Sequence, residues 1–258
     1  MKLPFVISIP HCGTRVPEEL RSGMALNRRE ILESVDSGTS EIFSRIPAQV
    51  IVQAQWSRLV VDLNRNPLQR DGKGVVALTD YHGRRIFKTG SEPPPGQIEQ
   101  RVRDYHTPYH EQLQHALKRP DCLALFDCHS LNGTGPADAP DAGQKRKDIV
   151  LSNNGDAGGR PRTNAGAVTC PPDLMLTIAE QFEQQGFSVS LNVPYKGGYI
   201  INHYARQLVQ NGRFAVQIEI NQDLYMKGQS LESDAVQTAD IVGRLTSALS
   251  LVARGLKA

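Results

Sequence analysis

The chain has 258 residues, a length at which α/β proteins often form one domain around a single large core. Lysine and arginine total 29 against 27 for aspartate and glutamate, a near balance that argues against nucleic acid or an anionic membrane surface as a partner. The four cysteines form no CxxC pair, which favours a reducing compartment, and the short, proline-interrupted apolar start predicts neither a signal peptide nor a membrane span. We therefore expect a cytoplasmic protein with one α/β domain over residues 1–258.

In the first half of the chain, β-rich runs alternate with helical spacing. The predicted strands cover residues 5–9, 50–53 and 58–63, and the predicted helices cover residues 27–35, 39–46 and 97–118. Asn27 is the N-cap candidate of the first helix. Pro108 should kink or divide the last helix, because proline has no backbone N–H. Residues 68–96 are rich in glycine, proline and charged residues without periodicity, which predicts a long ordered loop.

The second half is organised around residues 122–130, an apolar run that ends in Asp127, His129 and Ser130. Such a run, bounded by polar residues, is typical of a strand buried on both faces of a parallel sheet. Further strands are predicted over residues 147–152, 187–191 and 214–220, and helices over 171–186 and 233–251. Strands and helices alternate throughout, so we expect a mainly parallel or mixed sheet covered by helices on both faces.

Polar residues gather at the ends of these elements, where sheets of this kind bind their ligands. They are His11, Asp36, Asp127, His129 and Glu219. A hydrolytic zinc site needs such a set: three nitrogen or oxygen ligands, an open position and a carboxylate base. Taken singly, each residue also has an ordinary structural explanation, such as a hydrogen-bonded strand-end histidine or an acidic residue paired with an arginine.

His106 and His110 are four residues apart, which puts them on one face of a helix. The first histidine is not followed by glutamate, and Pro108 lies between the two, so the zinc-protease pattern HExxH is rejected. Either histidine could still hydrogen-bond the substrate or support the site from behind.

Seven short blocks follow one another along the chain. They are residues 8–13, 35–38, 61–65, 105–110, 127–130, 196–204 and 217–221. In this order they resemble the blocks of the N-formylglutamate amidohydrolase family. The resemblance implies a three-layer α/β/α fold similar to that of zinc carboxypeptidases and N-acetylmuramoyl-alanine amidases. It also implies hydrolysis of N-formyl-L-glutamate to L-glutamate and formate, a reaction of histidine catabolism.

The same resemblance implies a role for each residue of the proposed site. His11, Asp36 and His129 would hold Zn²⁺, and Glu219 would act as the general base. Asp127 or His203 remains an alternative to Asp36 as third ligand. Asp127 and Asp62 are also considered as groups that hydrogen-bond the metal ligands without binding the metal themselves.

A substrate with two carboxylates requires fixed cationic or polar donors, for which the planar fork of arginine is well suited. The residues expected to bind substrate are Asn64, Arg65, His110, Tyr199, His203 and Arg206. Two other functions remain open. A related zinc amidase could act on another N-acyl-amino acid or peptide, and a non-catalytic protein of the same fold could bind such a ligand without turnover.

Overall fold

A six-stranded sheet runs through the computed structural model of the protein, which describes residues 2–137, 139–228 and 230–256. Its strands are β1 (Leu3–Ile9), β2 (Ala48–Gln53), β3 (Ala124–Leu131), β4 (Ile149–Ser152), β5 (Val189–Leu191) and β6 (Phe214–Asn221), in the order β2-β1-β3-β6-β4-β5. All neighbouring pairs are parallel except β4 and β6, which run antiparallel. The prediction of a mainly parallel or mixed sheet is therefore confirmed, as a mixed sheet.

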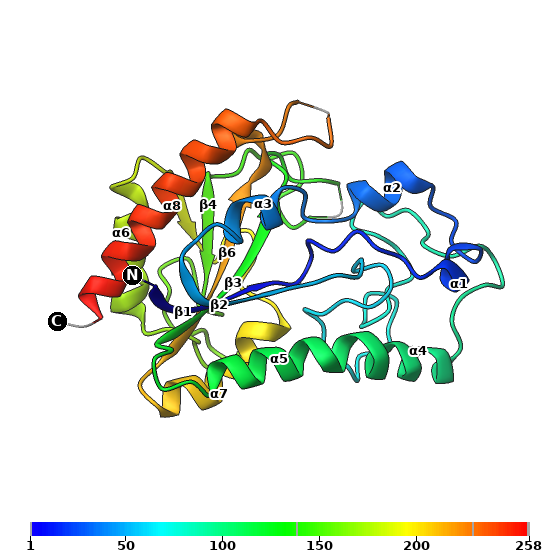
Figure 1. Ribbon diagram of the computed structural model, residues 1–258, viewed down its shortest axis with the longest axis horizontal. Helices are drawn as coiled ribbons and strands as arrows, with labels where there is room; N and C mark the ends of the chain where they lie inside the picture. Colours follow the sequence, from blue (N-terminus) through cyan, green and yellow to red (C-terminus); the bar gives the residue numbers. More distant parts are fainter. Residues whose placement is uncertain (1, 138, 229, 257–258) are drawn as a thin grey trace.

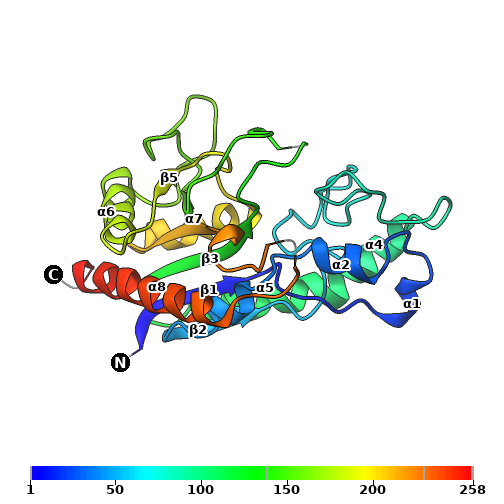
Figure 2. The same cartoon turned by 90° about the horizontal axis from the view of Figure 1, so that it is seen from above.

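Helices cover both faces of this sheet (Figure 1). They are α1 (Glu18–Arg21), α2 (Arg28–Glu33), α3 (Thr39–Phe43), α4 (Pro95–Arg101), the π-helical turn η1 (Val102–His106), α5 (Thr107–Leu117), α6 (Pro172–Glu183), α7 (Tyr199–Gln210), the 3₁₀ turn η2 (Gln222–Leu224) and α8 (Ala235–Gly255). Helices α3, α6 and α8 pack on one face, and α5 and α7 on the other (Figures 1 and 2). The result is the three-layer α/β/α architecture expected from the alternating pattern.

Along the central strands, successive side chains alternate between the two faces of the sheet. In β3, Phe126 and Cys128 join the core under α3, α6 and α8, whereas Leu125 joins the core under α5 and α7. Asp127 and His129 follow Leu125 on that second face. The strand is buried along its whole length, as predicted, but it continues to Leu131, so both polar residues lie within it rather than beyond its end.

The segment after β2 departs from the prediction. Residues 58–63 were expected to form a strand, yet residues 54–94 contain no helix and no strand, and residues 59–63 lie in turns and coil. Their apolar side chains are buried in the core beside α5 and α7, all facing inward instead of alternating. The apolar run therefore reflects burial alone, without a neighbouring strand to pair with. The expected long loop over residues 68–96 is present up to Pro94, and α4 begins at Pro95.

The helical ends follow their local chemistry. Asn27 forms a capping box with Glu30, as its position predicted. Pro108 does not break its helix; instead the π-helical turn Val102–His106 precedes it and α5 continues from Thr107. Asp234 accepts hydrogen bonds from the backbone N–H groups of Val236 and Gln237 at the start of α8.

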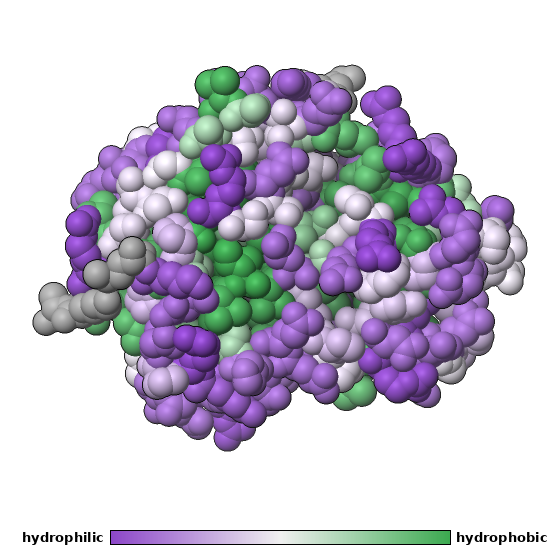
Figure 3. All heavy atoms as spheres, viewed as in Figure 1, coloured by the Kyte–Doolittle hydropathy of each residue, from purple (hydrophilic) through white to green (hydrophobic). Residues whose placement is uncertain are grey.

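The outer surface is mostly hydrophilic in the space-filling view, with apolar patches between polar side chains (Figure 3). This distribution agrees with covering helices that turn one face to the sheet and the other to solvent. Among the described residues, the helices include none that combines the length and the apolar character needed to cross a membrane.

Candidate active site

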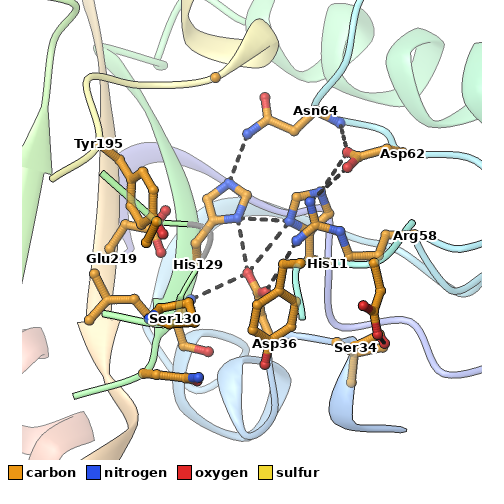
Figure 4. Close-up of a pocket in the computed structure, with 18 of the residues that line it drawn as sticks. His11, Ser34, Asp36, Arg58, Asp62, Asn64, His129, Ser130, Tyr195 and Glu219 are labelled. Carbon is orange, nitrogen blue, oxygen red and sulfur yellow. Dashed lines mark hydrogen bonds and ion pairs between the residues drawn. The ribbon is translucent and has the colours of Figure 1, made fainter. Parts of the chain in front are cut away.

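A cavity of about 360 Å³ lies at the carboxyl ends of β1, β3 and β6 and is bordered by the irregular segment after β2 (Figure 4). Its lining includes His11, Asp36, Asn64, His129 and Glu219. Parallel strands present their carboxyl ends at one edge of the sheet, which is where ligands bind in such folds. The structure thus brings together residues that are distant in the sequence, such as His11 and Glu219, which are 208 positions apart.

Three side chains from separate elements converge in this cavity. The Nδ1 atoms of His11 and His129 are 3.1 Å apart, and Asp36 Oδ2 lies 3.0 Å from His129 Nδ1 and 3.6 Å from His11 Nδ1. Zinc bonds of about 2.0–2.1 Å in a tetrahedral site place neighbouring ligand atoms about 3.3 Å apart. The spacing of these three atoms therefore fits one shared cation. Among the described residues, His11, Asp36 and His129 form a group whose ligand atoms lie close enough together to hold a metal ion.

The far nitrogen of each imidazole is held by a carboxylate, and Figure 4 shows Asp62 in this position behind His11. His11 Nε2 is 2.7 Å from Asp62 Oδ1, and His129 Nε2 is 2.9 Å from Asp127 Oδ2 and 3.1 Å from Asn64 Nδ2. A carboxylate behind a histidine fixes the ring tautomer, so that the other nitrogen presents its lone pair to a metal. Both rings therefore direct Nδ1 at the same point.

The charge balance of the site also favours a cation. The carboxylates of Asp36, Asp62 and Asp127 are buried here beside the carboxyl group of Glu219, and Arg58 is packed among them. Buried anions need compensating positive charge because they have lost hydration. The donor types, their spacing and the excess negative charge together fit a divalent metal.

The same charges shift the acid–base behaviour of the ligands. Burial disfavours the charged form of His129, but Asp127 and Asp36 outweigh it and hold the pKa of His129 well above its usual range. Burial likewise opposes ionisation of Asp36, yet hydrogen bonds from His11 and His129 hold the pKa of Asp36 below its usual range. Asp36 is therefore ready to bind a cation as a carboxylate.

Glu219 stands on β6 directly beside His129, its partner in the parallel register of β3 and β6. Its Oε1 accepts a hydrogen bond of 2.9 Å from Gln217 Nε2, two residues earlier on the same face. Burial, followed by the nearby charges of Asp36 and Asp127, raises the pKa of Glu219 to about 8. A carboxyl group in this setting can exchange a proton near neutral pH.

Neither alternative third ligand shares the converging position. Asp127 is behind the ring of His129 and also accepts a hydrogen bond of 2.6 Å from Ser8 Oγ. His203 is exposed on α7, where its Nδ1 is 3.0 Å from the hydroxyl of Tyr199. Asp36 is the acidic residue that the structure places between the two Nδ1 atoms.

The residues expected to bind substrate divide into two groups. Asn64 and Arg65 line the cavity with His11 and His129. His110, Tyr199 and His203 instead line a second cavity, of about 470 Å³, between the η1–α5 helix, α7 and residues 67–70, and the two cavities share no lining residue.

Arg206, expected to bind substrate, is exposed on α7 and lines neither cavity. The structure therefore does not bring it, or the three residues of the second cavity, to the point where His11 and His129 converge. Helix α7 carries Tyr199, His203 and Arg206, and α5 carries His110, on the flank of the sheet instead of beyond the strand ends.

The lining residues that were not singled out from the sequence include Arg58, Arg146, Tyr195 and Gln217. The Arg58 guanidinium binds Asp62 Oδ2 at 2.7 Å and lies 3.7 Å from Asp36 Oδ1. Arg146 is buried, pairs with Asp141 at 2.7 Å and is 3.1 Å from the hydroxyl of Tyr195. Gln217 carried a usable signal, because it stands two residues before Glu219 and must share its face of β6.

Comparisons with known proteins identify the family of the chain. The family model of N-formylglutamate amidohydrolase matches residues 3–226. N-formylglutamate deformylases of Pseudomonas putida and Pseudomonas aeruginosa are each 29% identical to the chain, over 245 and 241 residues, which are 88% and 89% of this chain and 83% and 84% of theirs.

Solved structures support the same fold. The crystal structure of an N-formylglutamate amidohydrolase from Ralstonia eutropha JMP134 superposes with a TM-score of 0.75 at 22% identity, covering 98% of this chain and 95% of that one. A gene product of Agrobacterium tumefaciens superposes with a TM-score of 0.71 at 16% identity, covering 98% and 91%. Because the family model matches most of its length, the chain belongs to the N-formylglutamate amidohydrolase family.

Proposed function

We propose that this protein is a metal-dependent amidohydrolase that cleaves the formyl amide of N-formyl-L-glutamate to L-glutamate and formate. The observation that carries the proposal is the convergence of His11, Asp36 and His129 in one cavity with Glu219 on the neighbouring strand. The family match and the names of the Pseudomonas relatives supply the substrate.

His11 Nδ1, Asp36 Oδ2 and His129 Nδ1 are the atoms that would hold the metal, which we propose to be Zn²⁺. Zinc is consistent with two imidazoles and one carboxylate, since catalytic zinc sites use three protein ligands and leave a position open. When bound, the ion supplies Lewis acidity, which makes water more acidic and polarises a carbonyl oxygen. Asp62 and Asp127 keep the two rings in the orientation that binding requires.

Glu219 performs the proton transfers. It removes a proton from the water that attacks the formyl carbon, and it returns this proton to the amine nitrogen as the C–N bond breaks. The carboxyl group stays in place because Gln217 holds one of its oxygens, and its raised pKa suits a group that must both accept and release a proton. Arg58 places positive charge beside the cavity, where the developing negative charge on the formyl oxygen is stabilised.

Arg65 and Asn64 are the proposed contacts of the substrate carboxylates. Arg65 is exposed and lines the cavity, so its guanidinium is free to form the paired hydrogen bonds that a carboxylate accepts. The Asn64 amide is fixed in the buried part of the same wall. A small molecule the size of a formylated amino acid is the ligand class that such a cavity accommodates.

The test combines metal content with formate release. We expect near-stoichiometric zinc in the wild-type protein, loss of zinc in His129→Ala, and chelator-sensitive formate release from N-formyl-L-glutamate. Glu219→Gln should retain zinc but release formate 10²–10⁴-fold more slowly, since it lacks only the proton-transfer group. N-formyl-L-glutamine is the matched control substrate, because it has the same length and one carboxylate fewer.

Each contrary outcome removes a different part of the proposal. Zinc without formate release would keep a hydrolase but discard this substrate, in favour of another N-acyl-amino acid. A fully loaded protein that turns over none of these amides would indicate a ligand-binding role. Wild-type protein that takes up no metal would refute the mechanism.

A further inference from the structure

The short segment Asp62 to Arg65 supplies three groups to the site. Asp62 holds His11, the Asn64 amide touches His129, and Arg65 lines the cavity. This segment belongs to no strand, so its carbonyl groups have no sheet partner. Buried backbone carbonyls must be hydrogen-bonded by another group, and the source of those bonds determines where the segment lies.

The carbonyls on either side of Asn64 are bound by two histidines of the long helix. His110 Nε2 is 2.9 Å from the carbonyl oxygen of Leu63, and His106 Nε2 is 3.1 Å from that of Arg65. A carbonyl oxygen can only accept, so each Nε2 must carry a proton and donate it. The peptide units 63–64 and 65–66, on either side of the 64–65 peptide, are thereby fixed from the α5 side.

The opposite side of Asn64 is held by the start of α7. The backbone N–H of Ile200 donates to Asn64 Oδ1 at 2.8 Å, and that of Tyr199 donates to the Asn64 carbonyl oxygen at 3.3 Å. Gly198 packs so closely that a Cβ there would lie 2.2 Å from Asn64 Nδ2. Asn64 thus sits between two elements, with its Nδ2 directed at His129.

The two histidines form a rigid pair. Their rings stack with centroids 4.2 Å apart, and His110 Nδ1 is 3.0 Å from the hydroxyl of Tyr204. Burial lowers the pKa of both rings, that of His110 to about 3, so each is neutral with a single ring proton. The π-helical turn Val102–His106 ends at the first of them, a local departure from α geometry at the point where the ring must reach the segment.

We propose that His106 and His110 are positioning residues of the active site. Through their Nε2–H···O=C hydrogen bonds they fix the backbone on both sides of Asn64, and so hold Asp62 and Asn64 against the two histidines that converge on the metal position. They contact neither substrate nor metal. Their effect on turnover rests on the proposed substrate, whereas their effect on metal affinity rests only on the proposed metal site.

The test removes the donors and then restores one. His106→Leu, His110→Leu and the double variant lose the N–H groups, while His110→Gln keeps an amide N–H near the position of Nε2. His115→Leu is the matched control, the same substitution on the exposed face of the same helix. For each variant, the Zn²⁺ affinity is measured by chelator competition, kcat and KM by formate release, and Tm by thermal unfolding.

We expect kcat/KM to fall about 10–100-fold in the leucine variants, since misplacement of a site by about 1 Å can cost 10²-fold. Zn²⁺ affinity should fall about 10-fold, the low end for groups that support ligands. His110→Gln should recover most of both losses, and His115→Leu should match wild type. Leucine variants with a lower Tm but unchanged Zn²⁺ affinity and kcat/KM would show a merely structural role and overturn the proposal.

Two further arms keep the result decisive. If a leucine variant does not fold, His110→Gln is compared with His110→Asn, whose shorter amide cannot reach the Leu63 carbonyl. Equal Zn²⁺ affinity in that pair overturns the proposal, and weaker binding by His110→Asn supports it. If wild-type protein releases no formate, the proposed substrate fails, and the Zn²⁺ affinities alone decide the role of the two histidines.

Discussion

Asp127→Asn removes the negative charge behind His129, a proposed metal ligand, while it keeps the shape of the side chain. Asp127 Oδ2 accepts from His129 Nε2 at 2.9 Å, and Oδ1 accepts from Ser8 Oγ at 2.6 Å. In the variant, the amide oxygen can still accept from His129, while the amide NH₂ donates to Ser8 Oγ. Ser8 can then direct its proton to the Tyr109 hydroxyl, 2.9 Å away, which donates to the Val52 carbonyl. The hydrogen bonds are conserved, and only the negative charge is lost.

The magnitude follows from this isolated change. Groups that support a metal-binding histidine typically contribute 10–100-fold to metal affinity. We therefore expect Asp127→Asn to weaken Zn²⁺ binding by about 1.4–2.8 kcal/mol, the free-energy equivalent of that factor. The assay is competition with a chelator of known affinity, with circular dichroism of the metal-free proteins as a control for folding.

Asp62→Asn is the comparison that tests the reasoning. Asp62 Oδ1 accepts from His11 Nε2 and from the Asn64 N–H, and Oδ2 accepts from Arg58 at 2.7 Å. An amide NH₂ at either position would face a donor, leaving a buried donor unpaired at a cost of about 1–3 kcal/mol. Asp62→Asn should thus lose more Zn²⁺ affinity than Asp127→Asn. Unchanged affinity in both variants, or the reverse order, would refute the assignment of these carboxylates.

Two further predictions concern the surroundings of the site. Gly198→Ala would bring a Cβ within 2.2–2.5 Å of the Asn64 side chain, so we expect kcat/KM to fall at least about 10-fold. Gly243→Ala, on the exposed face of α8 with open space around it, should leave kcat/KM unchanged, and equal values in the two variants would contradict the close packing. Burial lowers the pKa of His110 from 6.5 to about 3, so this ring binds a proton more readily in the unfolded chain than in the folded one. The contribution of the neutral ring to stability is therefore present above pH 6.5 and is lost as the pH falls towards 3. The free energy of unfolding is measured with urea between pH 6.5 and 4 at matched metal content. Its slope against pH should be smaller in His110→Gln than in wild type by up to about 1.4 kcal/mol per pH unit. Parallel slopes would show that His110 is not buried as a neutral ring.

Local pattern was sufficient for the elements of the sheet. Six of the seven predicted strands, the Asn27 cap among the helix signals, and the buried strand around Asp127 formed where predicted, because alternation, capping and apolar runs depend on near neighbours. The same patterns placed His11 and His129 at one sheet edge, since both stand at the carboxyl ends of parallel strands. The order of short blocks along the chain then indicated the family, which the comparisons confirm.

Other features depended on contacts distant in sequence. The segment over residues 58–63 is as apolar as a strand, yet it forms none, because no other strand lies beside it to supply hydrogen bonds. His110 and His203 carry the chemistry of a site, but helices α5 and α7 place them in a second cavity. No local pattern predicts either outcome, since the structure of residues 58–63 and the positions of the two histidines depend on the elements that pack against them.

The proposed third ligand shows most clearly which features follow from local sequence and which depend on the fold. Residue types alone left Asp36, Asp127 and His203 open, because each can bind a metal. Only the fold brings Asp36 Oδ2 within 3.0 Å of a ring nitrogen 93 residues away, while it turns Asp127 to the back of the same ring. The sequence by itself determined six of the strands and the polar side chains near their carboxyl ends. The tertiary structure decided which of those side chains meet, because convergence depends on the packing of distant elements and not on local propensity.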